Sequence, residues 1–123
     1  MYELTHHIVS LPTSQYIQEY RNPEKFISFC QQCERYNRCW ACPPFEFNTD
    51  EYLSGYQQTY IIGTKITFET ATRNSCTTLE QHKTISLQAI ESARKIIDPQ
   101  LLTLEHEYPD SRAFYAGTCH LCP

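Results

Sequence analysis

The chain has 123 residues, a mass of 14.5 kDa and a net charge of −4, so it fits one domain over residues 1–123 whose core needs neither metal nor disulfides. Ten Lys and Arg residues, without a basic run, argue against nucleic acid as the partner. No stretch reaches the ~20 apolar residues that a bilayer needs, and no export signal follows Met1, so we expect a soluble, cytoplasmic protein without a membrane partner.

The first part of the chain predicts one strand and two helices. Residues 2–11 are rich in β-branched and apolar side chains and are followed by a proline, which indicates a strand. A short helix is predicted over residues 13–21. The next helix is predicted to begin at Asn22, because Asn caps helix N-termini and Pro23 suits the first helical position.

The middle of the chain predicts a loop, a helix and a strand. Residues 39–47 contain two consecutive prolines and indicate an irregular loop. Asn48, with a glutamate three positions later, predicts the start of a short helix. The clearest strand pattern covers residues 59–68, where apolar side chains recur at every second position.

The last third of the chain predicts mainly helix. Thr77 and Glu80 form the pattern of a capping box, which predicts a helix over residues 77–97. Asp98 and Pro99 are expected to end that helix. The remaining predicted elements are a helix at 101–108 and a strand at 112–116.

Strands that alternate with helices predict an α/β fold. We expect a three- or four-stranded, mostly parallel or mixed sheet with packed helices and a cysteine-rich loop. Functional sites in such folds gather at strand ends and in the adjacent loops. The last predicted strand would then carry the C-terminal cysteines toward the cysteine-rich segment at residues 30–47.

Seven cysteines are the outstanding feature of the composition. An odd number without an export signal does not suit a disulfide framework, and in a reducing compartment paired cysteines indicate metal or redox chemistry. Six of them form three Cys-x-x-Cys pairs, namely Cys30 with Cys33, Cys39 with Cys42, and Cys119 with Cys122. Cys76 stands alone and is expected to be a thiol without metal.

The cysteine pairs predict a metal centre, since zinc and iron–sulfur clusters take about four thiolates and two residues three positions apart can chelate one ion. The first two pairs are separated by five residues, which leaves a shared ion geometrically open. This spacing matches neither a zinc ribbon nor a ferredoxin. Zinc and an iron–sulfur cluster therefore both stay open, in a structural or an electron-carrying role.

Two alternative functions are a thiol–disulfide oxidoreductase and a protein-interaction module with a structural metal. A redox Cys-x-x-Cys gains thiolate character at the beginning of a helix, whereas Cys30 and Cys33 are predicted at a helix end. The aromatic residues of the cysteine segment, including Trp40, are expected to form an apolar wall around the thiolates. No catalytic set emerges, so enzymatic activity stays undecided, and the expected partner is an unspecified protein or redox partner.

Two longer patterns resemble a known family. They are Cys30-x-x-Cys33-x-x-Tyr36-x-x-x-Trp40-x-Cys42-Pro43-Pro44-Phe45 and Ala116-Gly117-Thr118-Cys119-His120-Leu121-Cys122. The chain resembles the family named domain of unknown function 2284, described as predicted metal-binding proteins. The resemblance implies that Cys30, Cys33 and Cys42 are signature cysteines, with Cys39 outside the signature.

The same resemblance implies that Cys119 and Cys122 open a second cysteine run, of which this chain contains residues 117–123. Members of the family continue with further cysteines in a pattern that resembles iron–sulfur ligation. A complete second cluster would accordingly need ligands from the first run or from another chain.

Overall fold

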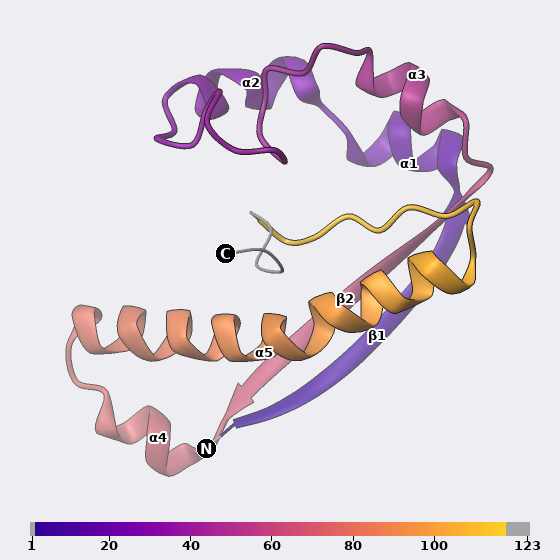
Figure 1. The fold of residues 1–123 in the computed structure, drawn as a ribbon. Helices are drawn as coiled ribbons and strands as arrows, with labels where there is room; N and C mark the ends of the chain where they lie inside the picture. The colour runs from indigo at the N-terminus through magenta and orange to yellow at the C-terminus, as the bar shows by residue number, and fades with distance from the viewer. Residues whose placement is uncertain (1, 118–123) are drawn as a thin grey trace. The chain divides into compact units, whose positions relative to one another are not determined.

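The computed structural model describes residues 2–117. In chain order the elements are β1 (Tyr2–Pro12), α1 (Thr13–Tyr20), α2 (Pro23–Gln31), α3 (Thr49–Ser54), β2 (Gln58–Phe68), α4 (Thr70–Ser75) and α5 (Leu79–Glu107) (Figure 1). No helix of the described part combines the length and the apolar character that crossing a membrane requires.

The sheet of the described residues has two strands, β1 and β2, which run antiparallel. The rings of Tyr2 and Phe68 lie with centroids 6.1 Å apart, and Nδ1 of His6 lies 3.0 Å from Oγ1 of Thr64. Residue numbers therefore rise along one strand as they fall along the other. The prediction of three or four mostly parallel strands is wrong, although the mixture of helices and strands is as expected.

The physical reason lies in how the chain connects the two strands. The backbone N–H of Thr13, just after β1, donates to the carbonyl of Gln57, just before β2, over 3.0 Å. The Thr13 side chain is buried, and its hydroxyl lies 2.8 Å from that of Thr59. The connection thus returns to the end of the sheet from which it left, and a parallel pair would have required a crossover.

The predicted strand at residues 112–116 is also wrong. Glu105, in the last turns of α5, accepts a hydrogen bond from the Arg112 guanidinium over 2.9 Å and another from the Ala113 backbone N–H over 3.2 Å. These residues pair with a carboxylate of α5, and no strand is formed at 112–116 in the described chain.

The short helices begin where the sequence predicts. The side chain of Asn22 accepts a hydrogen bond from the Lys25 N–H at the start of α2, with proline in the first turn. The side chain of Asn48 accepts from the backbone N–H groups of Asp50 and Glu51 at the start of α3. Each asparagine satisfies donors that the first helical turn leaves without an intrahelical partner.

The long helix α5 differs from the two shorter helices predicted in this region. Its N-cap is Thr78, one residue after the expected Thr77, in a capping box with Gln81, and the helix continues through Pro99. Proline removes one backbone hydrogen bond and ordinarily breaks or kinks a helix. An ion pair between Arg94 and Asp98, 2.8 Å long, spans the turn before the proline and stabilises the helix there. The helix α4 has no counterpart among the predicted elements.

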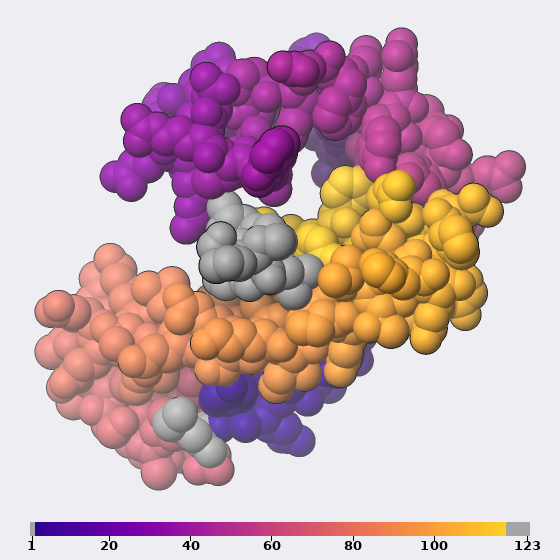
Figure 2. All heavy atoms as spheres, viewed as in Figure 1, coloured from indigo at the N-terminus to yellow at the C-terminus, as the bar shows by residue number. Residues whose placement is uncertain are grey.

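The described residues form two compact units, one of residues 2–8 and 62–113 and the other of residues 9–61 and 114–117. In the first unit, α5 buries Ala89 and Ala93 together with the Arg94–Asp98 pair. Other apolar side chains of α5, such as Leu87, are exposed, and the orange atoms of this helix are open to solvent in Figure 2.

The Arg94–Asp98 pair gives a test of this unit. Asp98→Asn is expected to lower the free energy of unfolding by about 3 kcal/mol, because it leaves the charge of a buried guanidinium without its carboxylate. Asp50→Asn, which weakens an ion pair whose carboxylate is more than half exposed, is the control and is expected to cost below about 1 kcal/mol. Urea denaturation measures both, and equal losses would contradict a structural role for the buried pair.

Candidate metal centre

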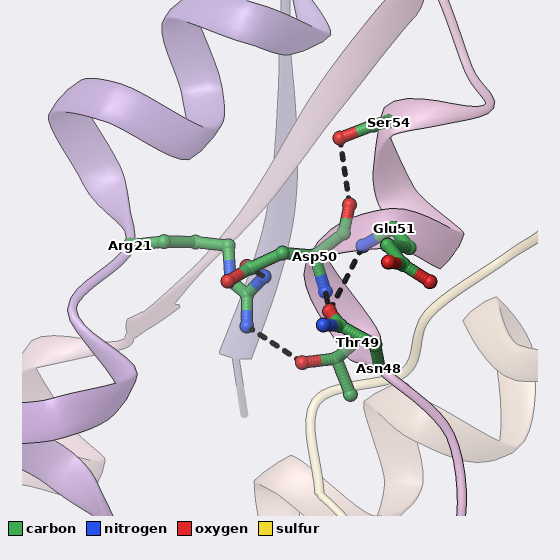
Figure 3. A network of polar contacts seen from close by, with 6 residues as sticks. All are labelled: Arg21, Asn48, Thr49, Asp50, Glu51 and Ser54. Carbon is green, nitrogen blue, oxygen red and sulfur yellow. Dashed lines mark hydrogen bonds and ion pairs between the residues drawn. The ribbon is translucent and has the colours of Figure 1, made fainter.

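An ion pair closes the part of the chain that contains the first two cysteine pairs. Arg21, between α1 and α2, donates to Asp50 in the first turn of α3 over 2.6 Å and to Oγ1 of Thr49 over 3.3 Å (Figure 3). Helices α1 and α3 contact each other beside this pair. Cys30, Cys33, Cys39 and Cys42 all lie in the chain between Arg21 and Asp50. The cysteine segment is therefore a loop with a fixed base.

Each of the two pairs lies in a hydrogen-bonded turn. Cys30 is in the last turn of α2, and the N–H of Cys33 donates to its carbonyl over 3.0 Å. The N–H of Cys42 donates to the carbonyl of Cys39 over 3.1 Å. A turn of this kind brings the first and fourth residues together, which is the arrangement that lets Cys-x-x-Cys chelate one ion.

The chain between the pairs reverses direction. The N–H of Tyr36 donates to the carbonyl of Cys33 over 3.1 Å, so turns follow one another without a gap. Asn37 has a φ of 59°, in the left-handed region that Asn tolerates better than most residues. Its N–H donates to the carbonyl of Pro43 over 2.7 Å. This hydrogen bond returns the second cysteine pair toward the first.

The thiol of Cys42 interacts with those of Cys39 and Cys33. Partial burial raises the pKa of the Cys42 thiol, and the negative charges that Cys39 and Cys33 carry when ionised raise it further. A hydrogen bond with the Cys39 side chain acts in the same direction, whereas the positive charge of Arg35 opposes it. Cys42 thus lies within electrostatic range of two other cysteines, one from each pair.

The donor set fits a thiophilic metal in its chemistry, but its convergence is incomplete. Four thiols from two chelating turns are the ligands that zinc and iron–sulfur clusters prefer. Among residues 2–117, however, no three His, Cys, Asp or Glu side chains are positioned to hold one ion together. Cys30 and Cys39 are half-buried, and Cys33 is exposed.

The third pair, Cys119 and Cys122, lies outside the described residues, as does most of the run at 117–123. Residues 114–117, which lead to this pair, belong to the same compact unit as the loop with the first two pairs. Cys76 follows α4 in the other unit. The role of Cys76 as a thiol without metal stays a prediction.

The surroundings of the cysteines correct one expectation. Trp40 is 99% exposed, so the prediction that it forms part of an apolar wall around the thiolates is wrong. Phe45 and Phe47 do contact each other, with ring centroids 5.6 Å apart, but both are exposed as well. The cysteine segment is consequently open to solvent on its aromatic side.

The sequence did not predict the two contacts that shape this loop. The Arg21–Asp50 pair joins residues 29 positions apart, and nothing in the local pattern of either residue signals the other. The turn at Asn37 had a signal that could have been used, because Asn is among the few residues that adopt left-handed backbone readily.

The raised pKa of Cys42 predicts its reactivity in the metal-free protein. Cys42 is expected to react with iodoacetamide more slowly than the exposed Cys33 at about pH 8, since a raised pKa lowers its thiolate fraction. The rate at Cys42 should increase as pH rises toward about 10, and peptide mass spectrometry measures it.

Cys39→Ser tests the cause of that slow reaction. Without the Cys39 thiolate and hydrogen bond, the pKa of Cys42 should fall and its alkylation at about pH 8 should accelerate. Cys76→Ser is the matched control, because it removes a thiol from the other unit. Equal acceleration in both variants would contradict an interaction between Cys39 and Cys42.

Comparison with known proteins places this loop in a family. No curated protein and no solved structure matches the chain. The family described as "Predicted metal-binding protein (DUF2284)" matches residues 16–123, which include all three cysteine pairs and most of the chain. The chain belongs to this family of predicted metal-binding proteins, as its cysteine pattern indicated.

Proposed function

We propose that the protein holds a cysteine-ligated zinc or iron–sulfur centre in a structural or electron-carrying role. Cys30, Cys33 and Cys42 are the core ligands, and Cys39, Cys119 or Cys122 completes the set. The single observation that carries the proposal is the return of the loop, which brings Cys42 within electrostatic range of Cys39 and Cys33. Membership of a family of predicted metal-binding proteins also supports it.

The electrostatics of the thiols favour a cation. Ionised thiols that lie near one another repel, and this repulsion contributes to the raised pKa of Cys42. A bound cation replaces the protons and converts the repulsion between thiolates into attraction to a shared centre. Arg35 lowers the pKa of Cys42, but it supplies a single positive charge against several thiols.

The fixed base of the loop also favours metal binding. Because Arg21 and Asp50 hold the ends of the cysteine segment, the chain between them has less conformational freedom to lose when ligands converge. Within it, the turns at Cys30–Cys33 and Cys39–Cys42 already have the backbone hydrogen bonds of chelating pairs. For the four thiols to reach one metal centre, one turn must move toward the other, but no new turn has to form.

The position of Cys30 argues against a thiol–disulfide oxidoreductase. Its place in the last turn of α2 puts it at the negative end of the helix dipole. Redox-active Cys-x-x-Cys motifs use the opposite end of a helix. A metal cation supplies the positive charge that this helix end lacks.

Metal analysis after anaerobic purification of the full chain tests the proposal. We expect stoichiometric zinc, or iron with acid-labile sulfide and brown absorbance, in the wild-type protein. Cys30→Ser, Cys33→Ser and Cys42→Ser should each lower the metal content by at least about tenfold, because each removes a core ligand. Cys76→Ser is the matched control and should retain full occupancy.

Two outcomes would contradict the proposal. One is a wild-type protein without stoichiometric zinc or iron, and the other is metal content that none of the three substitutions lowers. Reduction of insulin by the metal-free protein, lost in Cys39→Ser, would support the oxidoreductase instead.

Removal of the metal should destabilise the loop more than the rest of the chain. Structural zinc contributes about 10–16 kcal/mol in zinc-finger peptides, and we expect a smaller effect here because a chain of 123 residues is long enough to fold largely without it. Hydrogen exchange should accelerate after chelation at residues 33–43 and change little in the middle of α5. Equal acceleration in both regions would show that the metal holds the whole fold.

A further inference from the structure

The second cysteine pair, Cys39 with Cys42, has a backbone geometry that suits a disulfide. The N–H of Cys42 donates to the carbonyl of Cys39 over 3.1 Å, which closes a four-residue turn. The first and fourth Cα atoms of such a turn lie within about 7 Å of each other, and disulfides span about 4.4–6.8 Å between Cα atoms. A bond between these two sulfur atoms therefore fits the turn as it is.

The two side chains of this pair are also in contact. Cys39 and Cys42 share a side-chain hydrogen bond, and both thiols are half-buried. Trp40, which lies between them in the chain, is 99% exposed. The turn is thus at the surface, where a small molecule in solution reaches it.

The partner of Cys42 is defined by the kind of interaction that each neighbouring thiol makes with it. Cys33 acts on Cys42 through its charge, whereas Cys39 acts through both its charge and the hydrogen bond. Cys33 lies in a different turn, which its own N–H closes with the carbonyl of Cys30. Of the two thiols that influence Cys42, Cys39 is the one placed to form a bond with it.

We propose that Cys39 and Cys42 are a redox modification site, which a low-molecular-weight disulfide oxidises to an intramolecular disulfide that prevents metal binding. The modification is reversible, because a small thiol in excess reduces the bond again. The effect on metal rests on the proposed function, whereas formation of the disulfide does not depend on a metal centre.

The oxidation is a balanced thiol–disulfide exchange. The thiolate of one cysteine attacks the small disulfide, forms a mixed disulfide with it and releases one small thiol. The thiolate of the other cysteine attacks the protein sulfur of the mixed disulfide, forms the Cys39–Cys42 bond and releases the second small thiol. Two electrons pass from the protein to the small disulfide, and the two thiol protons pass to the released thiols. The turn makes the second attack intramolecular, which favours it over reaction with another molecule.

The disulfide removes ligands from the proposed metal centre. Metals bind cysteine as the thiolate, and neither sulfur of a disulfide is a thiolate. Cys42 is a core ligand of the proposed centre, and Cys39 is one of the residues that complete it. The oxidised chain must therefore be reduced before it binds metal, and bound metal in turn protects the pair from oxidation.

Trypsin separates the cysteine pairs, which allows each to be measured by itself. Cleavage after Lys and Arg leaves the second pair in peptide 39–65, the first in peptide 26–35 and the third in peptide 113–123. The metal-free full-length protein is incubated with oxidised glutathione, alkylated with iodoacetamide and digested. We expect peptide 39–65 to have lost two hydrogens and to carry no alkyl group, whereas peptide 26–35 carries two alkyl groups.

Cys39→Ser should abolish the internal disulfide of peptide 39–65, and Cys76→Ser, the matched control in the other unit, should oxidise as the wild-type protein does. A fully alkylated peptide 39–65 in the wild-type protein would overturn the proposal. So would a disulfide that joins peptide 39–65 to peptide 26–35, because Cys42 would then pair across the turns.

Uptake of Zn²⁺ tests the effect on metal, since thiolates bind this ion without further components. The oxidised protein should take up at least about tenfold less zinc than the reduced protein, and dithiothreitol should restore the uptake. Equal uptake by both forms would overturn the control of metal binding. Failure of the reduced protein to bind zinc would instead contradict the proposed zinc centre, and the mass of peptide 39–65 decides the disulfide in that case too.

Discussion

The hydrogen bond between the Thr13 N–H and the Gln57 carbonyl is the contact on which the arrangement of this half of the chain depends. It joins the residues that leave β1 and enter β2, and the buried Thr13 side chain reinforces it through Thr59. The strands must then run antiparallel, and residues 13–57 between them must leave the sheet and return to the same end of it. Within this connection, the ion pair of Arg21 with Asp50 closes a shorter loop, residues 21–50. The hydrogen bond of Asn37 with Pro43 closes a still shorter one, residues 37–43. The cysteine pairs lie in the innermost part.

These successive closures explain how a short sequence brings Cys42 within electrostatic range of Cys39 and Cys33 without a disulfide. Each closure shortens the free chain that the next must order, which lowers the entropy cost of the inner contact. The cost that remains is that of ionising the thiols, and it appears as the raised pKa of Cys42, which is caused first by burial and then by the charges of Cys39 and Cys33. Repulsion among ionised thiols does not stabilise a protein by itself. A cation at this position would remove the penalty and use the order already present in the loop.

Local signals in the sequence predicted much of this structure. Asn22 and Asn48 cap the helices they were expected to cap, because capping depends on a few neighbouring residues. Features that depend on distant contacts were mispredicted or missed. Pro99 was expected to end a helix, but α5 continues through it beside the Arg94–Asp98 pair. Residues 112–116 have strand-like composition, but Glu105 binds two of them instead. The Cys-x-x-Cys spacings identified the family, whereas the return of the loop required the Asn37–Pro43 contact.

The exposure of Trp40 follows from the same turn that prepares the second cysteine pair. When a four-residue turn brings Cys39 and Cys42 together, its two central residues lie at the outer side, where a large ring has no core to enter. A small residue would serve the turn equally well, as Ala41 does beside it. The turn therefore explains why the side chain at position 40 is exposed but gives no reason for it to be tryptophan.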